Sequence, residues 1–556
     1  MKNNVLLEIL LAFLLAVTLY AQEAPSPSAT SQKPLQELLA QALQSYRTGK
    51  FDAATEEYQA ALQQDPKSGE AYAGLARTYL KQNSVQAAFD TAEKGIAAAP
   101  DSPAVHTALG EVYFRQGKMV ESESEFRKTV NTGHPEARAC LGLARLYDAL
   151  SFHARAKTML EKAHALDPDD PDIQRRWLST LSRSERTHSL EDYLSKSMND
   201  DKETRDSLQR YLTLLKEREK QAGKSCKLVS KLTATQTDLK AMMTDPTHLH
   251  GFGLAVKVNG QSARLLLDTG ASGLLINKKM AEKAGIKPLA ATKIGGIGDS
   301  RETEGYVGYA DSIKVGDLEF QNCLVEVSEK RSVLDDDGLI GADVFSHYLV
   351  VLDFPNQKLK LEELPKRPDE KEKTATLSTN EDDDDEDSAV PPEPHDPYVA
   401  AEMQSYTKVW RFGHMLLIPT TVADLASKRL FLIDTGSSVT HISPEAASEV
   451  KKLYESNAQI QGLSGSVKNV YRTSDIVLEF GHLRKENDDI TAFDLSRISR
   501  YPGTEISGIL GITALGFTAM KIDYRDGLVN FDYDKSHWRS VPLTGFSTGP
   551  KSSKVQ

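Results

Sequence analysis

The chain contains one short apolar-acidic stretch twice, and this duplication limits what it can fold into. Residues 265–272 read Leu-Leu-Leu-Asp-Thr-Gly-Ala-Ser, and residues 431–438 read Phe-Leu-Ile-Asp-Thr-Gly-Ser-Ser. The apolar run before each aspartate is typical of a buried β-strand. Gly270 and Gly436 allow a sharp turn after the acid. Each copy therefore predicts a carboxylate held on a tight turn at the end of a rigid strand.

Further landmarks follow both copies in the same order. Each aspartate is followed 28 residues later by a glycine of a glycine-rich turn, then by a Gly-apolar-apolar-Gly stretch, then by another aspartate 12 residues on. The landmarks are the turns 295–298 and 462–465, the stretches 338–341 and 508–511, and Asp353 and Asp523. The same four landmarks occur in the same order and at nearly the same spacing in both copies, which indicates an internal duplication.

These landmarks resemble the pepsin-like and retroviral-type aspartic peptidases. A lobe of that family carries apolar-apolar-Asp-Thr-Gly, a glycine-rich flap and then apolar-apolar-Gly. The resemblance implies two mainly-β lobes at 225–364 and 402–545 that form a pseudo-two-fold pair within one chain. It also implies that Asp268 and Asp434 are the catalytic residues.

The resemblance assigns roles to the neighbouring residues as well. In the family, the threonine hydroxyl bonds across to the backbone of the opposite lobe, and a serine hydroxyl after the glycine would hydrogen-bond its aspartate. Ala271 stands where the second copy has that serine, so the two acids are expected to have different surroundings. The residues expected to support the pair are Thr269, Gly270, Ser272, Thr435, Gly436 and Ser437; those expected in flaps or substrate contact are Gly295, Gly296, Ile297, Gly298, Gly462, Leu463 and Gly465; those expected to pack the loops are Gly341 and Gly511.

Two copies of the motif suit the hydrolysis of an amide by water. The reaction needs a base that takes a proton from water and an acid that protonates the leaving amine. Two adjacent carboxyls cannot both ionise easily, so they share one proton and divide these roles, as in known aspartic proteases. The expected substrate is a polypeptide, and the reaction requires neither a metal nor an organic cofactor.

Upstream of these motifs, the sequence repeats with a period of 34. Small residues recur at 42, 76, 110 and 144 and at 54, 88, 122 and 156, and tyrosines recur at 79, 113 and 147. This pattern resembles the tetratricopeptide repeat. It predicts an all-α solenoid over 35–220, with four repeats (35–68, 69–102, 103–136 and 137–170), a degenerate fifth and a charged capping helix at 201–220.

Such solenoids bind proteins or extended peptides, so a protein or peptide ligand is an expected partner. By analogy, the concave face should carry five basic residues: Arg77, Lys81, Arg115, Arg138 and Arg145. They could form a basic trough for an acidic peptide, but ordinary solvated helix charge is the favoured interpretation.

The start of the chain resembles a secretory signal, with Lys2, a mostly apolar run and a small residue, Ala21. Residues 1–21 are therefore interpreted as a signal peptide, or alternatively as an uncleaved anchor, and 22–34 as a spacer. The protein is then expected to be exported, periplasmic or secreted, with no further membrane span. The net charge of −12 makes nucleic acid an unsuitable partner. The three cysteines allow at most one intramolecular disulfide.

Residues 365–401 are expected to be a disordered acidic linker, because 381–387 are all acidic. One hypothesis places this linker on the basic face of the repeats. The tail at 546–556 is rich in Gly, Ser and Lys and is expected to be frayed.

Three other patterns are interpreted as structural. The stretch His248-Leu249-His250 lacks further metal ligands. The three aspartates at 335–337 lack the ligand spacing of a cation loop. His441 and Ser443 near Asp434 lack the Gly-x-Ser-x-Gly elbow of a serine hydrolase.

Two hypotheses about function remain besides the lead one, an exported aspartic endopeptidase. The chain could be a non-catalytic scaffold that keeps the peptidase fold to bind peptides or proteins. Alternatively, the two lobes could pair between chains and not within one. The substrate, the pH optimum and the oligomeric state are open at this point.

Overall fold

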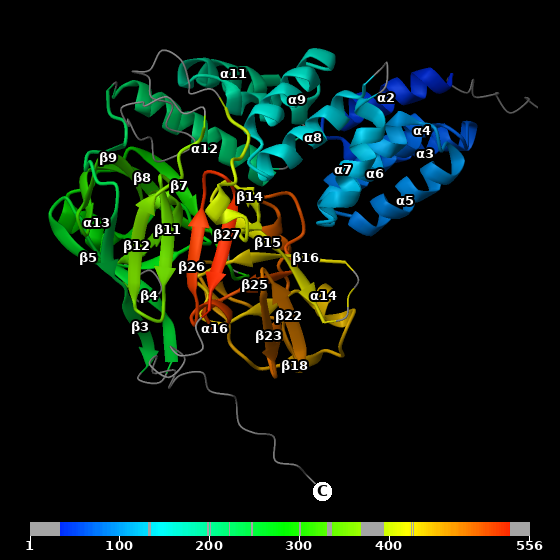
Figure 1. Cartoon of the computed structure of the whole chain (residues 1–556). Helices are drawn as coiled ribbons and strands as arrows, with labels where there is room; N and C mark the ends of the chain where they lie inside the picture. Colours follow the sequence, from blue (N-terminus) through cyan, green and yellow to red (C-terminus); the bar gives the residue numbers. More distant parts are fainter. Residues whose placement is uncertain are drawn as a thin grey trace, which may run out of the picture.

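The computed structural model describes residues 34–131, 135–196, 200, 202–221, 223–245, 248–299, 302–330, 336–368, 394–423, 425 and 427–533. The predicted signal peptide, nearly all of the spacer, the acidic run of the linker and the C-terminal tail lie outside these residues. In the described part, a helical region is followed by a mainly-β region (Figure 1).

The helical region consists of paired antiparallel helices, two in each 34-residue repeat. Their bounds are α2 Leu35–Arg47, α3 Phe51–Gln64, α4 Gly69–Lys81, α5 Val85–Ala98, α6 Pro103–Arg115, α7 Met119–Val130, α8 Ala137–Ala149, α9 His153–Leu166, α10 Pro171–Trp177, η1 Leu178–Thr180, α11 Arg183–Lys196 and α12 Lys202–Glu219. Within the described residues, no helix is both long enough and apolar enough to cross a bilayer.

The small residues of the 34-residue pattern make room for aromatic rings between helices. A Cβ at Gly74 would lie 2.1 Å from the ring of Tyr58, and Cβ atoms at Gly110 and Gly142 would lie 2.7 and 2.3 Å from the ring of Phe126. Even an alanine would collide at these positions. The period seen in the sequence is therefore a packing requirement of the helix pairs.

The first β-region is a nine-stranded sheet in the order β1-β9-β6-β10-β5-β4-β8-β7, with β3 beside β4. Its elements are β1 Lys227–Leu228, β3 Lys240–Asp245, β4 His248–Val258, β5 Gln261–Asp268, β6 Leu274–Asn277, α13 Lys278–Ala284, β7 Ala290–Ile294, β8 Thr303–Val315, β9 Leu318–Ser328, β10 Gly338–Gly341 and η2 Ala342–Phe345. Strand β5, which ends at Asp268, runs parallel to β10.

The second β-region repeats this plan in a ten-stranded sheet, order β18-β21-β24-β17-β25-β16-β15-β22-β23, with β14 beside β15. Its elements are η3 Ala401–Met403, β14 Trp410–Phe412, β15 Met415–Val422, β16 Arg429–Ile433, β17 His441–Ile442, α14 Pro444–Ser448, β18 Tyr454–Ser456, β19 Gln461–Gly462, β20 Gly465–Ser466, β21 Val470–Thr473, β22 Ile476–Phe480, β23 Leu483–Asn487, β24 Ile490–Ala492, α15 Ser496–Ser499, β25 Gly508–Leu510 and α16 Ile512–Leu515. Strand β16 precedes Asp434 and runs parallel to β25, as β5 does to β10.

A third sheet contains strands from both β-regions, in the order β13-β27-β26-β11-β12-β2 (Figure 1). Its strands are β2 Thr235–Asp238, β11 Tyr348–Asp353, β12 Lys358–Glu363, β13 Thr407–Lys408, β26 Ala519–Asp523 and β27 Leu528–Asp532. Strands β11 and β26 pair antiparallel at its centre, with Val351 opposite Lys521. The two β-regions thus share backbone hydrogen bonds.

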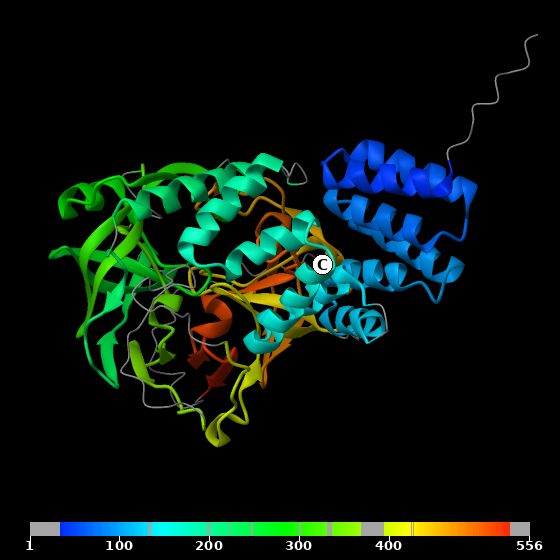
Figure 2. The same cartoon turned by 90° about the horizontal axis from the view of Figure 1, so that it is seen from above.

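The helical region packs directly on the second β-region. The rings of Phe114 and Phe412 meet edge to face at 6.2 Å, and the Thr504 hydroxyl donates to the Phe114 carbonyl at 2.7 Å. Arg145 stacks on Phe114, 4.0 Å from the ring centre. Seen from above in Figure 2, the later helices lie over the β-regions, while the first repeats extend to one side.

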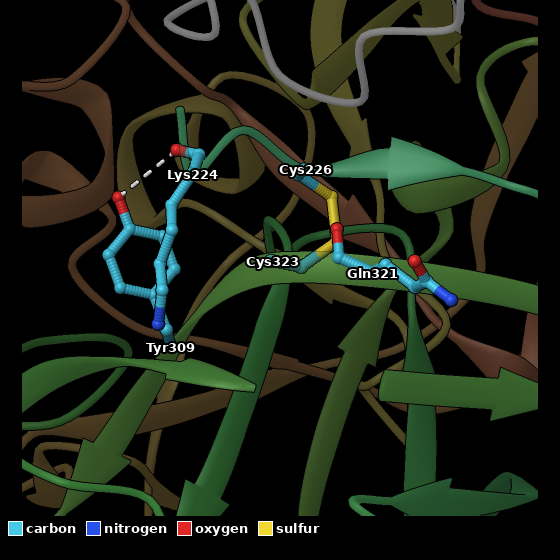
Figure 3. Close-up of a disulfide and its surroundings, with 5 residues drawn as sticks. All are labelled: Lys224, Cys226, Tyr309, Gln321 and Cys323. Carbon is cyan, nitrogen blue, oxygen red and sulfur yellow. Dashed lines mark hydrogen bonds between the residues drawn. A yellow bond between two sulfur atoms is a disulfide. The ribbon is translucent and has the colours of Figure 1, made fainter. Parts of the chain in front are cut away.

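A disulfide joins Cys226 to Cys323 and anchors the segment after α12 to β9 (Figure 3). Beside it, the Tyr309 hydroxyl donates to the Lys224 carbonyl at 3.5 Å. The third cysteine, Cys140, is buried in α8. The sequence predicted at most one such bond without saying which cysteines form it.

Candidate active site

The two Asp-Thr-Gly turns meet at the boundary between the β-regions. A Cβ at Gly270 would lie 2.9 Å from Cγ of Asp434, and one at Gly436 would lie 2.5 Å from Cγ of Asp268. Each turn therefore needs glycine because the opposite aspartate occupies the space of a side chain. The two carboxyls lie close enough to hydrogen-bond to each other.

The two threonines, both buried, cross-link these turns symmetrically. The Thr269 hydroxyl donates to the Ile433 carbonyl at 2.8 Å and accepts from the Thr435 amide at 3.0 Å. The Thr435 hydroxyl donates to the Leu267 carbonyl at 2.8 Å and accepts from the Thr269 amide at 3.1 Å. The threonine contact that the resemblance implied is thus present in both directions. It fixes the relative positions of the strands that carry the aspartates.

The surroundings of the two acids differ. Asp268 accepts from the Gly270 amide at 2.7 Å, whereas Asp434 accepts from the Gly436 amide at 2.9 Å and the Ser437 amide at 3.1 Å. Burial raises the pKa of Asp268. Burial, and then the adjacent Asp268 carboxyl, raise the pKa of Asp434 well above its ordinary value. The pair therefore retains a proton more strongly than isolated carboxyls do.

The serine side chains do not contact the pair as expected. The Ser437 hydroxyl donates to the Val439 carbonyl at 2.9 Å, so its backbone amide, not its hydroxyl, binds Asp434. The expectation about this hydroxyl was wrong because the turn directs it along its own loop. Ser272 donates to Asp343 at 2.6 Å and likewise supports the loop, not the aspartate.

Sequence reasoning missed Asp343, which supports the loop after Asp268. Its carboxylate accepts from the Ser272 hydroxyl and, at 3.1 Å, from the Gly273 amide, and so holds the loop after Asp268. Thr513, two residues after Gly511 as Asp343 is after Gly341, accepts from the Thr440 amide at 2.9 Å. The equal offsets from Gly341 and Gly511 were the signal that could have identified both residues.

Gly341 and Gly511 lie beside these loops. A Cβ at Gly341 would lie 2.5 Å from the Ala271 carbonyl oxygen, and one at Gly511 would lie 2.3 Å from that of Val439. Their lack of a side chain lets the parallel strands β10 and β25 pass close to the loops that follow the aspartates.

The two glycine-rich turns, 295–298 and 462–465, contact each other. The first follows β7, and the second joins β19 to β20. The Gly296 amide donates to the Ser464 hydroxyl at 3.1 Å, and the Ser464 amide donates to the Ile297 carbonyl at 3.0 Å. Cβ atoms at Gly298 and Gly462 would lie 2.4 and 2.3 Å from carbonyl oxygens of the opposite turn. The two turns, which come from different β-regions, are therefore packed directly against each other.

Leu463 and Gly296 also lie together, since a Cβ at Gly296 would be 2.9 Å from Cβ of Leu463. Gly295 and Gly465 complete the two turns: a Cβ at Gly295 would be 3.4 Å from the Glu302 side chain, and Gly465 pairs with Gly462. Leu463 packs against the apolar side chains around Leu266, two residues before Asp268. The second turn thus reaches the strand that carries the first acid.

Two of the patterns interpreted as structural have structural contacts. His441 Nδ1 lies 2.6 Å from the Thr491 hydroxyl, and the Ser443 hydroxyl caps α14 by accepting from the Ala446 amide at 3.1 Å. Asp336 and Asp337 bind Arg264 through its side chain and its amide. Across the described residues, no group of three or more His, Cys, Asp or Glu side chains could hold a metal ion.

Three of the five basic residues expected on the concave face form salt bridges with acidic residues of the helical region. Arg77 and Arg138 bind Glu111, both at 2.7 Å, Arg138 also binds Asp170 at 2.7 Å, and Lys81 binds Asp172 at 2.7 Å. These three cations are neither free for an acidic peptide nor simply solvated.

The other two residues of this set, Arg115 and Arg145, also have contacts within the protein. Arg115 donates to Asn83 at 2.9 Å, and Arg145 packs at the contact with the second β-region. The sequence could not show this, because the partners lie many residues away along the chain.

Comparisons with known proteins agree with two parts of this description. Residues 254–344 match the aspartyl protease family, and residues 45–112 match the tetratricopeptide repeat family. The first match includes Asp268, the first glycine-rich turn and Gly341.

The chain is similar to several fungal proteins over about a fifth of its length. It is 31% identical over 121 residues to DNA damage-inducible protein 1 of Neurospora crassa, which is 21% of this chain and 27% of that protein. It is 32% identical over 113 residues to DNA damage-inducible protein 1 of Chaetomium globosum (20% and 24%), and 30% identical over 108 residues to UBA domain-containing protein Mud1 of Schizosaccharomyces pombe (19% and 31%). The chain thus spans no more than 31% of the length of these relatives.

Among solved structures, similarity is found to a thermophilic tetratricopeptide repeat protein of Thermus thermophilus, with 24% identity, a TM-score of 0.26, and coverage of 33% of this chain and 98% of that one. The PilF protein of Pseudomonas aeruginosa is similar with 17% identity, a TM-score of 0.23, and coverage of 34% and 86%. By its family matches, the chain carries tetratricopeptide repeats followed by a mainly-β region that contains an aspartyl protease domain.

Proposed function

We propose that this protein is an aspartic endopeptidase whose two β-regions are the two lobes of a single active site, with Asp268 and Asp434 as its catalytic pair. The observation that carries the proposal is the reciprocal bonding of Thr269 and Thr435, which holds the two carboxyls within hydrogen-bonding reach of each other. A groove that only bound peptides would have no need of two buried acids sharing a proton.

The pairing of β11 with β26 supports a pseudo-two-fold relation between the lobes. Val351 lies ten residues after Gly341, and Lys521 lies ten residues after Gly511. These equivalent residues are opposite each other in the sheet. Equivalent positions meet in this way when a two-fold axis passes between them. The register thus favours pairing within one chain over pairing between chains.

In the proposed mechanism, Asp434 carries the shared proton and Asp268 is ionised. Asp268 takes a proton from a water molecule while the water oxygen bonds to the peptide carbonyl carbon, and Asp434 gives its proton to the carbonyl oxygen. As the intermediate collapses, one of its two hydroxyls returns a proton to Asp434 and re-forms the carbonyl, the C–N bond breaks, and the leaving nitrogen receives the proton held by Asp268. The amides of Gly436 and Ser437 keep Asp434 oriented during both steps.

The compartment and partner are parts of the same proposal. Export is supported by the signal-like residues 1–21 and by the Cys226–Cys323 disulfide, since such bonds persist in oxidising compartments. The repeats are proposed to bind a protein partner or substrate through surfaces other than Arg77, Lys81 and Arg138, whose charges are already paired.

Peptide hydrolysis by the purified chain and by Asp268→Asn and Asp434→Asn tests the proposal. Either variant alone should abolish cleavage, because one carboxyl cannot supply both acid and base. Asp488→Asn, an exposed acid in the turn between β23 and β24, is the matched control and should remain active. A statine-type transition-state analogue should inhibit, and full activity in either dyad variant would refute the shared pair.

The second candidate function is a non-catalytic scaffold that binds peptides. The hydrogen bond between the two glycine-rich turns favours it, because a substrate that passed between the turns would have to break this bond. Under this alternative the wild type would bind peptides but leave them uncut, and the two Asn variants would bind equally well.

A further inference from the structure

One row of side chains crosses the first sheet beside the proposed catalytic pair. Leu266 pairs with Leu339, Leu339 pairs with Leu275, and Leu275 pairs with Glu326, across strands β5, β10, β6 and β9. Because side chains alternate along a strand, Leu266 projects from the same face as Asp268. The row therefore begins beside the first acid and leads away from it.

This row lies on the face opposite the main core. The neighbours of its members along each strand, such as Val325 and Val327 on either side of Glu326, belong to the main core. The three leucines instead form a separate apolar cluster with Met242 and Ile294, and Ala271 and Leu463 pack against it. This cluster joins residues from β5, which ends at Asp268, from β7, which leads into the first glycine-rich turn, and from the second glycine-rich turn.

Glu326 follows the three leucines in this row and places a carboxyl between Leu275 of β6 and the buried Val307 of β8, its partner on the other side. Its side chain is half-buried, and burial raises its pKa to about 7. No hydrogen bond or ion pair reaches this carboxyl from any residue that the structure describes. A half-buried carboxyl without a partner is costly, and a ligand that supplied a donor or a positive charge would remove that cost.

The equivalent row in the second sheet carries a different residue at this position. Leu432 pairs with Ile509, Ile509 with His441, and His441 with Thr491. Thr491 takes the place of Glu326, and its hydroxyl already lies 2.6 Å from His441 Nδ1. This pair is internally satisfied, so the two rows offer a substrate different chemistry.

We propose that Glu326 is a specificity-determining residue that binds a basic side chain, lysine or arginine, of the polypeptide substrate, at the end of a subsite floored by Leu266, Leu339 and Leu275. The inference rests on the proposed peptidase function and adds its substrate class. Glu326 lies three strand spacings, about 14 Å, from the Asp268 strand. A long side chain would lay its methylene groups along the leucines and bring its charge to the carboxylate.

The test compares cleavage of peptides that carry lysine or norleucine at each position around the scissile bond. The wild type should prefer lysine at one position by about 10- to 100-fold in kcat/KM, the effect of one charged hydrogen bond. Glu326→Gln should lose most of that preference, and Glu326→Leu should favour norleucine. Glu304→Gln, which removes an exposed carboxyl from the neighbouring strand β8, should keep the preference for lysine.

A binding measurement separates this inference from the proposed activity. The same peptides are titrated onto the Asp434→Asn protein and onto Asp434→Asn combined with Glu326→Gln, so no turnover is needed. If the wild type cuts no peptide but lysine peptides still bind more tightly through Glu326, the peptidase proposal fails and the subsite stands. If no position shows a lysine preference, or if the preference survives in both Glu326 variants, the subsite is refuted.

Discussion

Removing the Thr435 hydroxyl should destabilise the contact between the two β-regions. This hydroxyl is buried, donates to the Leu267 carbonyl and accepts from the Thr269 amide. Thr435→Val keeps the shape but leaves both backbone groups without their partner. Each unsatisfied buried group costs about 1–3 kcal/mol, so the expected loss is about 2–6 kcal/mol. Thr435→Ser keeps the hydroxyl and should lose far less.

The assay for this prediction is urea unfolding of the two variants beside the wild type, with peptide cleavage measured on the same samples. Thr435→Val should lower the unfolding midpoint of the β-regions and reduce cleavage, since the aspartate strands lose one of their two cross-links. Faster amide hydrogen exchange at Thr269 should accompany it. Equal midpoints and equal exchange in the Val and Ser variants would refute the reasoning that these bonds hold the turns together.

Four further changes test other parts of the structure. Cys226→Ser opens a disulfide between residues 97 apart in sequence and should lower the free energy of unfolding by about 2–4 kcal/mol, measured against the oxidised wild type. Burial raises the pKa of Asp523 from 3.8 to about 6, so the folded state binds the proton of this carboxyl more tightly than the unfolded state does. The folded protein therefore loses stability as the pH rises from 3.8 to about 6. Asp523→Asn should therefore stabilise the protein at pH 7, by at most about 3 kcal/mol, and flatten the fall in stability between pH 4 and 6. Asp353→Asn should destabilise it at pH 7, because Lys360 binds that carboxylate at 2.7 Å and, despite burial, holds its pKa below the ordinary value. Replacing residues 370–392 by a short Gly-Ser linker should leave cleavage unchanged, and a loss of activity would show that the acidic linker does more than join the lobes.

The linker prediction follows from where its two ends are held. Arg367, before the acidic run, and the Tyr398 amide, after it, both bind Oδ1 of Asp526, at 2.6 and 3.0 Å. Asp396 adds a salt bridge at 2.8 Å to Arg155 of α9. The described ends of the linker expected at 365–401 thus bind residues that lie far away along the chain, while its acidic run lies outside the described residues.

The sequence was most informative where one short motif must satisfy several constraints at once. The order Asp-Thr-Gly, glycine-rich turn and Gly-apolar-apolar-Gly recurs because close approach excludes a Cβ at Gly270 and Gly436 and, in the opposing turns, at Gly298 and Gly462. The 34-residue period recurs for the same reason, as Gly142 against Phe126 illustrates. Patterns of this kind are visible in sequence because no other residue fits.

Contacts between distant segments left no such pattern. Nothing in the stretch around Val351 marks Lys521 as its partner, since many apolar strands would pair equally well by composition alone. Phe114 and Phe412 carry the contact between the helical region and the second β-region, but each is an ordinary apolar residue in its own element. Such contacts depend on the shapes of complete folded units, which a local pattern does not encode.

Duplication followed by divergence accounts for the asymmetry at the site. The threonine cross-links and the glycine contacts are symmetric, because each half must receive the same element from the other. Positions outside these cross-links and contacts are free to differ between the two halves. Asp343 corresponds to Thr513, and Glu326 corresponds to Thr491. A site that must hold two equal carboxyls, yet bind a peptide that has a direction, gains from such differences. Exchanging Glu326 and Thr491 should therefore move a preference for a basic residue from one side of the scissile bond to the other while leaving the cleavage chemistry intact.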